Sequence, residues 1–167
     1  FRARGAARHV PPCGTISWEG EPADLVHLVI AGIVRCCRHT DSGRRQVARF
    51  ALPGDAVGLC LAPHWRHTNE AVGNVVIAAL SRSALEAALL SDGALRDARR
   101  VRLAEELDRR ELALARRAQL GAVAHLRVFL ADLARRISRP DGSLALEMTR
   151  QDIADHLGLS LETVSRG

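Results

Sequence analysis

A long stretch without helix-breaking residues limits the possible folds of this chain more than any other feature. Residues 94–119 contain neither Gly nor Pro and are rich in Ala, Leu, Arg and Glu, which favour a helix. We therefore predict one long helix. Leu103, Leu107 and Leu114 fall at coiled-coil-like steps along it, and such an apolar stripe needs a partner. We expect a dimer interface there; the alternative is packing along the chain's own N-terminal half.

The residues before this helix have a different pattern, with short apolar runs separated by turn signals. The predicted strands are residues 25–30, 33–38, 46–50 and 74–80. Gly and Pro-Gly sequences lie between them, and Ser81 or Ser83 is placed to begin a short helix. Short strands at this density are typical of an antiparallel barrel or jelly roll. With the helices that follow, the fold class is α+β.

The residues after the long helix predict a small helical domain. Gly121 is expected to interrupt the long helix, and residues 122–137 predict a further helix with two arginines near its end, where the dipole favours cations. Residues 144–146 predict a short strand. A helix and a strand ahead of the C-terminal segment suggest a winged-helix domain, whose wing would lie beyond Gly167.

The segment 149–167 has the pattern of two short helices joined by a glycine turn. Thr149, with Asp152 three residues later, predicts a capped helix start. Gly158 can supply a positive φ at the turn, and Ser160 can cap the second helix. This pattern is typical of a helix-turn-helix, which places side chains in the major groove of DNA.

The second helix of this segment has one apolar and one polar face. We expect Leu161 and Val164 to face the core. Glu162, Ser165 and Arg166 then lie on the opposite face, at spacings of three and four. The alternative is a pair of ordinary bundle helices with solvated Glu and Arg, but the caps, the glycine turn and the polar spacing agree with a helix-turn-helix. The sequence ends about two turns into this second helix.

Composition favours a nucleic-acid partner. The formal net charge is +5, and every cationic residue is Arg, which suits bidentate recognition of phosphate and guanine. A GC-rich genome is the alternative reason for the missing Lys. The aromatic content of 3% argues against stacking on single strands. No membrane-length apolar run or signal peptide is visible, so we expect a cytoplasmic protein without a membrane partner.

Together these motifs resemble the Crp/Fnr superfamily of bacterial transcription regulators, and most of all its Fnr- and FixK-type branch. The resemblance rests on EGEPAD (19–24), VIAGIV (29–34), GRRQV (43–47), FALPGDAVGL (50–59) and the segment 148–166. It implies an N-terminal double-stranded β-helix or jelly-roll sensor barrel, a long dimerisation helix and an incomplete C-terminal winged helix-turn-helix. The corresponding domain boundaries are 1–92, 93–120 and 121–167.

The resemblance implies a sequence-specific transcription regulator rather than an enzyme. It would bind a palindromic TTGA-type site as a homodimer, with RNA polymerase as a further partner. At the family's E-x-x-S-R positions, Glu162, Ser165 and Arg166 would contact bases: Arg can donate to guanine O6 and N7, and Glu can accept from cytosine. The expected phosphate contacts are Thr149, Arg150, Ser160 and Thr163.

No effector is predicted, although ligand-dependent relatives remain the alternative. Cyclic-nucleotide members carry a Gly-Glu pair and a later Arg-Ser/Thr-Ala, whereas here Leu59 follows Gly58 and residues 63–71 lack the second pattern. Arg66 in that segment is expected to be a solvated loop residue. The default is a FixK-type protein without a cofactor.

Cysteine and histidine spacing gives little support for a bound cluster, haem or metal. Iron–sulfur members need several closely spaced cysteines, and Cys13 alone lies near the visible start. Cys36 and Cys37 are adjacent on a strand, so we expect one buried and one exposed thiol. Cys60 could be redox-sensitive, although nothing indicates a lowered pKa.

The histidines are spaced as loop and surface residues. His64 and His67 lie three apart, and His27 and His39 flank a hairpin; a cupin-type metal enzyme would need a different spacing. One departure from the family is the pair Ala124-His125, where Glu-Arg is usual. This departure bears on communication between the domains.

Overall fold

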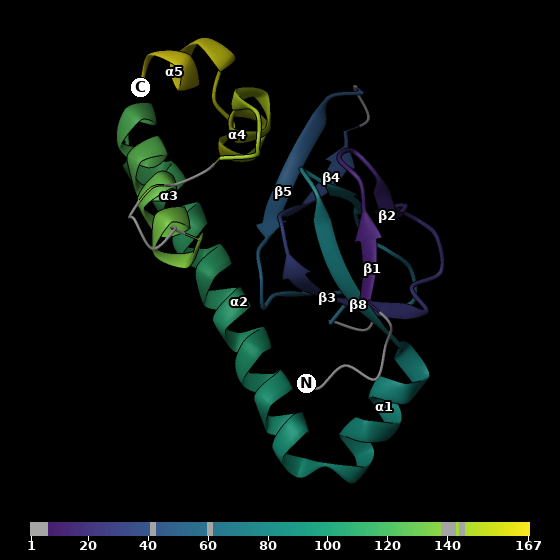
Figure 1. Cartoon of the computed structure of the whole chain (residues 1–167). Coiled ribbons are helices and arrows are strands. Elements are labelled where there is room, and N and C mark those ends of the chain that lie inside the picture. Colours follow the sequence, from purple (N-terminus) through teal and green to yellow (C-terminus); the bar gives the residue numbers. More distant parts are fainter. Residues whose placement is uncertain (1–6, 41–42, 60–61, 138–142, 144–145) are drawn as a thin grey trace.

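Figure 1 shows a computed structural model that describes residues 7–40, 43–59, 62–137, 143 and 146–167. Its N-terminal half is a β structure, followed by a long helix and a group of short C-terminal helices. The strands are β1 (Ala7–Val10), β2 (Thr15–Ser17), β3 (Leu25–Ala31), β4 (Val34–His39), β5 (Arg45–Ala51), β6 (Ala56–Val57), β7 (Thr68–Ala71) and β8 (Val75–Ser81). The helices are α1 (Arg82–Ser91), α2 (Gly93–Gln119), α3 (Ala122–Ile137), α4 (Arg150–Leu157) and α5 (Leu161–Arg166).

The strands form two antiparallel sheets with the orders β1-β8-β3-β6 and β2-β7-β4-β5. Side chains from both sheets meet in a buried core that includes Val29, Val34, Val75 and Ile77. Alternate residues of a strand face opposite sides, and β3 is buried on both sides near its start, at Val26 and His27, whereas Ile30 near its end is 46% exposed. The predicted α+β jelly-roll architecture is confirmed.

Glycine permits one close approach inside the barrel. Gly32, between β3 and β4, has φ +80°, a left-handed conformation that other residues adopt only with strain. A Cβ at this position would also collide with the carbonyl oxygen of Asn74 and the side chain of Val75. The turn therefore requires glycine for both its backbone angle and its packing.

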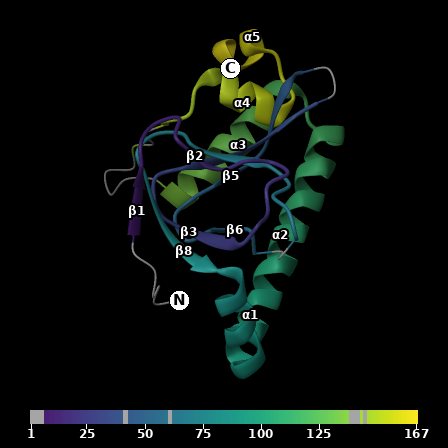
Figure 2. The ribbon, with the colours of Figure 1, turned by 90° about the vertical axis from the view of Figure 1, so that its right-hand side faces the viewer.

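Helices α1 and α2 follow the last strand. The predicted start of α1 is confirmed: the Oγ of Ser81 accepts a hydrogen bond from the N–H of Ala84 at 3.2 Å. The predicted long helix is also confirmed, because α2 ends at Gln119, before Gly121. Figure 2 shows α2 running along one side of the barrel to the C-terminal helices. None of the described helices has the length and apolar character needed to cross a membrane.

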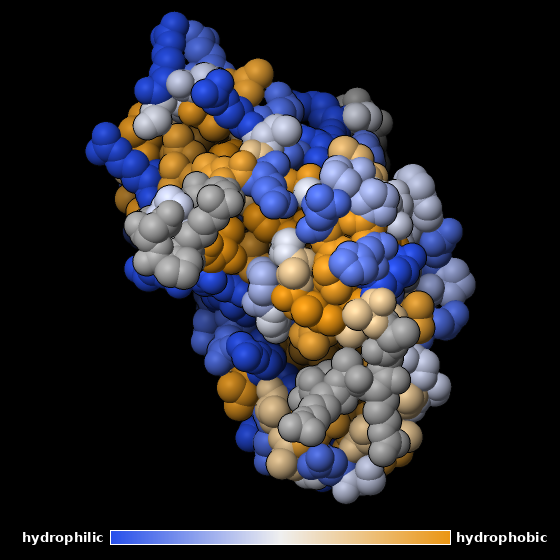
Figure 3. Space-filling view, viewed as in Figure 1, coloured by the Kyte–Doolittle hydropathy of each residue, from blue (hydrophilic) through white to orange (hydrophobic). Residues whose placement is uncertain are grey.

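The C-terminal helices share a second apolar core with the barrel. Leu126, Leu133 and Ile153 belong to the same buried cluster as Ile33 and Leu52 of the barrel. Figure 3 shows apolar side chains gathered around α3 and over the barrel, with hydrophilic ones at the end that carries α5. The helix-turn-helix is therefore packed against the barrel.

One prediction for this region is wrong, and another concerns residues that lie mostly outside the described part of the chain. Leu161 was expected in the core, but it is 47% exposed while Val164 is buried. As the first residue of the short helix α5, Leu161 falls outside the face that packs on α3. Most of the predicted strand 144–146 lies outside the described residues.

Candidate nucleic-acid interface

The start of α4 has the predicted capping box. The Oγ1 of Thr149 accepts a hydrogen bond from the backbone N–H of Asp152 at 3.0 Å, and a carboxylate oxygen of Asp152 accepts one from the N–H of Thr149 at 3.0 Å. Such reciprocal bonds satisfy donors that a helix start leaves free. At the other end of α4, Gly158 has φ +70° and its N–H donates to the carbonyl oxygen of Ala154 at 2.9 Å.

The second helix begins and packs largely as the pattern predicts. The Oγ of Ser160 accepts from the N–H of Thr163 at 3.1 Å, which confirms the predicted cap. Val164 is buried in the core shared with α3 and α4, and Leu159 packs against that core from the turn. The two helices and their turn therefore form a helix-turn-helix.

The three candidate base-contacting residues all lie on the exposed side of α5. Glu162, Ser165 and Arg166 are exposed. The guanidinium of Arg166 pairs with the carboxylate of Glu162 at 2.6 Å, with side chains 80% and 68% exposed. An exposed pair of this kind is worth only about 0.3–0.5 kcal/mol. Both side chains can therefore exchange each other for another partner at little cost.

The candidate phosphate contacts divide into two kinds. The hydroxyls of Thr149, Ser160 and Thr163 already take part in the helix caps: Thr149 donates to Asp152 at 2.8 Å, and the Ser160 and Thr163 oxygens lie 2.8 Å apart. The side chain of Arg150, at the start of α4, is exposed. A hydroxyl engaged in a cap must change partners to bind a phosphate.

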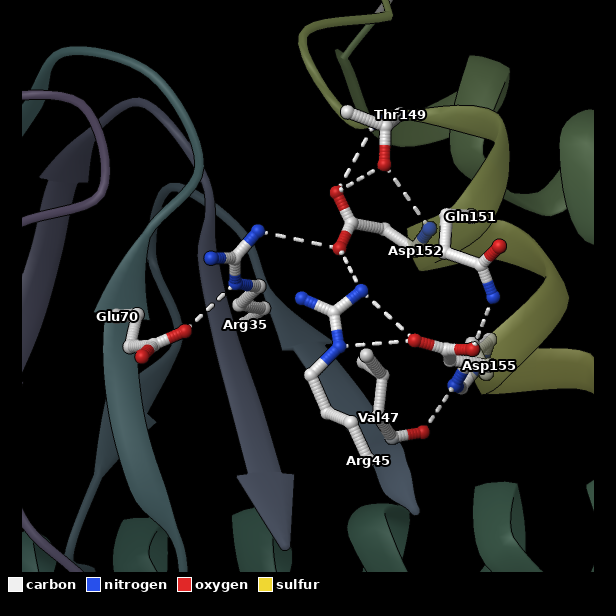
Figure 4. Close-up of polar contacts among 9 residues, drawn as sticks. Arg35, Arg45, Val47, Glu70, Thr149, Gln151, Asp152 and Asp155 are labelled. Atoms are coloured by element: carbon white, nitrogen blue, oxygen red, sulfur yellow. Dashed lines mark hydrogen bonds and ion pairs between the residues drawn. The ribbon is translucent and has the colours of Figure 1, made fainter. Parts of the chain in front are cut away.

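A network of ion pairs joins α4 to the barrel (Figure 4). The carboxylate of Asp152 accepts from the guanidinium groups of Arg35, at 3.1 Å, and Arg45, at 2.7 Å. Arg45 also donates to Asp155 at 2.8 Å, and Arg35 donates to Glu70 at 2.8 Å. We call these five residues the interdomain network.

The network sets the charge state of Asp152, whose side chain is only 1% exposed. Burial alone would raise the pKa of its carboxyl group. Hydrogen bonds from Thr149 and the charges of Arg35 and Arg45 outweigh burial and hold that pKa below its usual value. Asp152 is therefore an ionised, buried and fully partnered carboxylate.

A buried histidine lies beside the network on α4. The Nδ1 of His156 lies 3.0 Å from the carbonyl oxygen of Val47 on β5, and its ring contacts the rings of Phe50 and Phe129, with centroids 5.2 Å away. Arg117 of α2 donates to the backbone oxygen of His156. Burial lowers the pKa of this imidazole more than its bond to Val47 raises it, so the neutral ring donates from Nδ1.

This junction between α4 and the barrel was not predicted from the sequence. Asp152 was identified only as a helix cap, and its partners Arg35 and Arg45 lie 117 and 107 positions away. Arg is also a common exposed residue on strands. Only its pairing with α4 distinguishes Arg45 from its neighbour Arg44, and no local pattern reports such a pairing.

A cavity of about 300 Å³ lies between the barrel and α2, and its wall includes Arg49, Glu106 and Trp65. Arg49 donates to the carbonyl oxygen of Ala56 at 2.9 Å and lies 3.7 Å from the carboxylate of Glu106. Arg66, at the rim, is exposed. The buried cation in this cavity thus already has partners within the protein.

The cysteines differ from expectation. Cys36 and Cys37 are both 1% exposed, so the prediction of one exposed thiol is wrong. The strand pairing shifts between them; Cys36 joins the barrel core, whereas Cys37 lies beside Arg35, Arg45 and Glu70 of the interdomain network. Burial raises the pKa of both thiols, that of Cys37 to about 12. Cys13 is exposed, and Cys60 lies outside the described residues.

The histidines occupy two kinds of environment. His39 and His64 are exposed, in agreement with a surface role. His27, in contrast, is buried and stacks on Trp65 with ring centroids 5.6 Å apart, and its Nδ1 has no hydrogen-bond partner among the residues that the structure describes. Burial, with a smaller effect from charged neighbours, lowers the pKa of His27 and of His67 to about 4. Within the described residues, no cluster of His, Cys, Asp and Glu could hold a metal ion.

The chain resembles known proteins over nearly its whole length. It is 39% identical over 152 residues to the nitrogen fixation regulation protein FixK of Azorhizobium caulinodans, which covers 89% of this chain and 61% of that protein. It is 34% identical to the transcriptional activatory protein AadR of Rhodopseudomonas palustris, covering 96% of this chain and 69% of AadR. The chain thus spans about three fifths to two thirds of the length of these relatives.

A solved structure and two family matches agree with these relatives. The structure of FixK2 from Bradyrhizobium japonicum matches with a TM-score of 0.90 at 35% identity, covering 97% of this chain and 81% of FixK2. Residues 7–92 match the cyclic nucleotide-binding domain family, and residues 146–166 match the family of bacterial regulatory proteins, crp family. The barrel, the long helix and the helix-turn-helix have the arrangement of that family. This chain therefore belongs to the Crp/Fnr family of bacterial regulatory proteins, in its FixK-type branch.

Proposed function

We propose that this chain is the sensor and DNA-binding part of a dimeric, sequence-specific transcription regulator. The observation that carries the proposal is the capped helix-turn-helix with Glu162, Ser165 and Arg166 exposed on one face of α5. The family membership supports the same function, since FixK and AadR are named as regulators. An enzymatic role has no support from these relatives.

The chemistry of the exposed face suits one G·C base pair in each half of a palindromic TTGA-type site. Arg166 can donate two hydrogen bonds to guanine, while Glu162 accepts from the amino group of cytosine. Their ion pair in the free protein shows that the two side chains reach a common point. Arg150 is the strongest phosphate candidate, because Thr149, Ser160 and Thr163 are engaged in caps.

Dimerisation through α2 would place two recognition helices on one duplex, as a palindromic site requires. Leu107 and Leu114 are 57% and 65% exposed and lie seven positions apart on one face of α2, so together they can form an apolar contact surface for a second copy. Leu103 is half-buried and lines the cavity beside the barrel. We propose Leu107 and Leu114 as the centre of the interface, with Leu103 at its inner edge.

We further propose that DNA binding requires no cyclic nucleotide, although the barrel matches a family named for that ligand. The residues of the cavity fit a cyclic phosphate poorly. Arg49, Arg109 and Arg110 of the cavity wall are already paired with the carboxylate of Glu106, so a cyclic phosphate would have to compete with that carboxylate for these cations. A regulator whose DNA binding depends on an effector is the alternative, and its prediction is that added ligand strengthens binding.

The remaining parts of the proposal concern the cellular setting. A transcription regulator of this family would act in the cytoplasm, with RNA polymerase as its protein partner. The domain boundaries at residues 1–92, 93–120 and 121–167, with their sensor, dimerisation and DNA-binding roles, also stay a prediction. None of these points depends on the choice between ligand-dependent and ligand-independent binding.

The test is a fluorescence anisotropy titration of the full-length protein, purified without added ligand. One duplex carries two inverted TTGA half-sites and the other a scrambled sequence, each at two salt concentrations. We expect tight binding to the first duplex and weak, salt-sensitive binding to the second. Equal weak binding to both would contradict the proposal, whereas rescue by a cyclic nucleotide would favour the ligand-dependent alternative.

A further inference from the structure

We infer that Arg35 and Arg45 are positioning residues for DNA recognition, although they lie in the barrel. Through the interdomain network they hold α4, and with it α5, in one orientation on the sensor domain. The inference rests on the proposed function, because it concerns how the reading helix is presented to DNA. Arg35 and Arg45 lie on strands of the barrel, yet they would influence DNA binding, which α5 carries out.

The interdomain network runs without a break from the barrel to α4. Three of its members lie on strands, Glu70 on β7, Arg35 on β4 and Arg45 on β5, and two lie on α4, Asp152 and Asp155 (Figure 4). The ion pairs are partly or fully buried, with Asp152 only 1% exposed. Removing one partner of a buried carboxylate leaves a charge without compensation, so the docked position of α4 depends on both arginines.

Asp152 fixes both the start of α4 and the position of α4 on the barrel. One of its carboxylate oxygens accepts both hydrogen bonds from Thr149, which start α4. The other accepts both guanidinium groups, which dock α4 on the barrel. The residue that begins the helix is therefore also the residue that sets the position of the helix, and α4 cannot rotate on the barrel without breaking these bonds.

Other contacts support the same orientation. The Nδ1 of His156 donates to the backbone of Val47 on β5 at 3.0 Å. Arg136 at the end of α3 pairs with Asp55 of the barrel at 2.7 Å. These contacts lie on different strands and loops, so together they restrict both the tilt and the rotation of the helix-turn-helix.

The direction of the effect follows from which helix is held. The network contacts α4, whereas Glu162 and Arg166 of α5 are 68% and 80% exposed. Docking of α4 on the barrel therefore leaves the face of α5 that carries Glu162 and Arg166 exposed to DNA. Without the network the helix-turn-helix would sample many orientations, and a binding-competent state populated only in part weakens the apparent affinity in proportion.

Cys37 supplies a built-in reporter of docking. It is 1% exposed, and it pairs with Val47, whose carbonyl oxygen accepts from His156 of α4. The charged neighbours of its thiol are Arg35, Arg45 and Glu70. Asp152 of α4 holds Arg35 and Arg45 in place beside the thiol, so a small alkylating reagent should reach it faster when α4 leaves the barrel.

The experiment compares four variants of the full-length protein: Arg45→Gln, Arg45→Lys, the double variant Arg35→Gln with Arg45→Gln, and the control Arg38→Gln. Arg38 lies on β4 beside the others, but it is 57% exposed and pairs with Glu19 of the barrel at 3.0 Å. Each protein is tested for affinity to the TTGA duplex and for iodoacetamide modification of Cys37, located by peptide mapping. The Arg45→Gln variant retains Arg35 and so keeps the test valid if the double variant fails to fold.

We expect the double variant to bind the duplex at least tenfold more weakly and to be alkylated at Cys37 at least tenfold faster. Arg45→Gln alone should change both by several-fold, Arg45→Lys should fall between it and the wild type, and Arg38→Gln should change neither. Cognate DNA should slow the alkylation of the wild type, because coupling between docking and binding is reciprocal.

Two results would overturn the inference. One is that the double variant and Arg38→Gln behave alike in both assays; the other is faster alkylation combined with tighter DNA binding, which would make the docked state an inactive one. If the wild type does not distinguish the two duplexes, the proposed function fails. The alkylation assay then still decides whether Arg35 and Arg45 hold the junction.

Discussion

Helices α2 and α4 are made of similar residues but are stabilised in different ways. Over its fully described length, α2 contains no buried residue, and its ion pairs, such as Arg110–Glu106, are largely exposed pairs within one helix. The shorter α4 buries Asp152, Ile153, Ala154 and Leu157. Helix propensity and length account for α2, whereas caps and packing account for α4.

The difference teaches which contacts carry information between the domains. An exposed pair within one helix depends only on local spacing and contributes little. A buried pair between α4 and the barrel exists only when the two domains are docked, so it couples folding of one to the position of the other. The arginines of α2 thus keep an exposed helix soluble, whereas the guanidinium of Arg45 orients α4 on the barrel.

The largest test of this comparison is truncation of one leucine in each helix. Leu157→Ala should lower the free energy of unfolding by about 2–5 kcal/mol, because it leaves a cavity in the shared core. Leu114→Ala, at a position 65% exposed, should leave the stability of the monomer within about 0.5 kcal/mol and weaken dimerisation instead. Urea denaturation at low concentration and analytical ultracentrifugation separate the two effects. Equal losses of monomer stability would show that the two helices are packed alike.

The buried regions should also be sensitive to acid, which the exposed α2 should not be. The pKa of His27 is lowered from 6.5 to about 4, so between these values the unfolded chain binds a proton that the folded chain does not. Stability is then fully present above pH 6.5 and falls as the pH drops, by about 2 kcal/mol for this residue between pH 7 and pH 5.

Urea denaturation at pH 7 and pH 5 measures this loss. His27→Phe keeps the ring that stacks on Trp65 and removes the unpartnered Nδ1, so it should reduce the loss. His156, whose pKa is also lowered, should act in the same direction at the α4 junction. A variant with the same pH dependence as the wild type would exclude His27 as a cause.

An effect of similar size is expected on DNA binding when the exposed pair of α5 is removed. Arg166→Ala should weaken binding to the TTGA duplex by about 1–3 kcal/mol and relax discrimination at the guanine, while the stability of the free protein stays nearly constant because the pair with Glu162 is exposed. Anisotropy titrations with duplexes substituted at that base pair test this. An equal loss on every sequence would instead identify Arg166 as a phosphate contact.

The smallest effect is expected on α2 itself. Arg100 and Asp97 form a pair at 3.6 Å with side chains 80% and 72% exposed. Arg100→Ala should change the free energy of unfolding by less than about 0.5 kcal/mol, as thermal or urea denaturation can show. A loss of more than 1 kcal/mol would mean that this part of α2 is buried in the assembled protein, and would extend the proposed dimer interface to it.

Local patterns in the sequence were sufficient to predict the helices and the polar face of α5. The capping residues Thr149 and Ser160 and the turn at Gly158 were predicted correctly, because a cap or a left-handed turn involves only residues a few positions apart. The bounds of α2 were predicted for the same reason. The exposure of Glu162 and Arg166 follows from helical periodicity, which is also local.

The predictions that were wrong depended on what covers a surface. Strand alternation predicted that one of Cys36 and Cys37 is exposed, but the pairing of β4 shifts between them, and the side chains of Arg35, Arg45 and Glu70 lie around Cys37. Leu161 was assigned to the core by its apolar character, yet no element packs on that side of α5 in the described chain. Alternation and periodicity give the direction of a side chain, not the identity of its neighbour.

The sequence by itself therefore determined the helices and their caps, the strands β3, β4, β5 and β8, and the polar face of α5, because each depends on residues within a few positions of one another. Only the tertiary structure decided that Asp152 joins Arg35 and Arg45, that α4 docks on β5, and that a thiol lies beneath this junction. Contacts across more than a hundred residues are formed by the folded chain as a whole, and no spacing in the sequence encodes them.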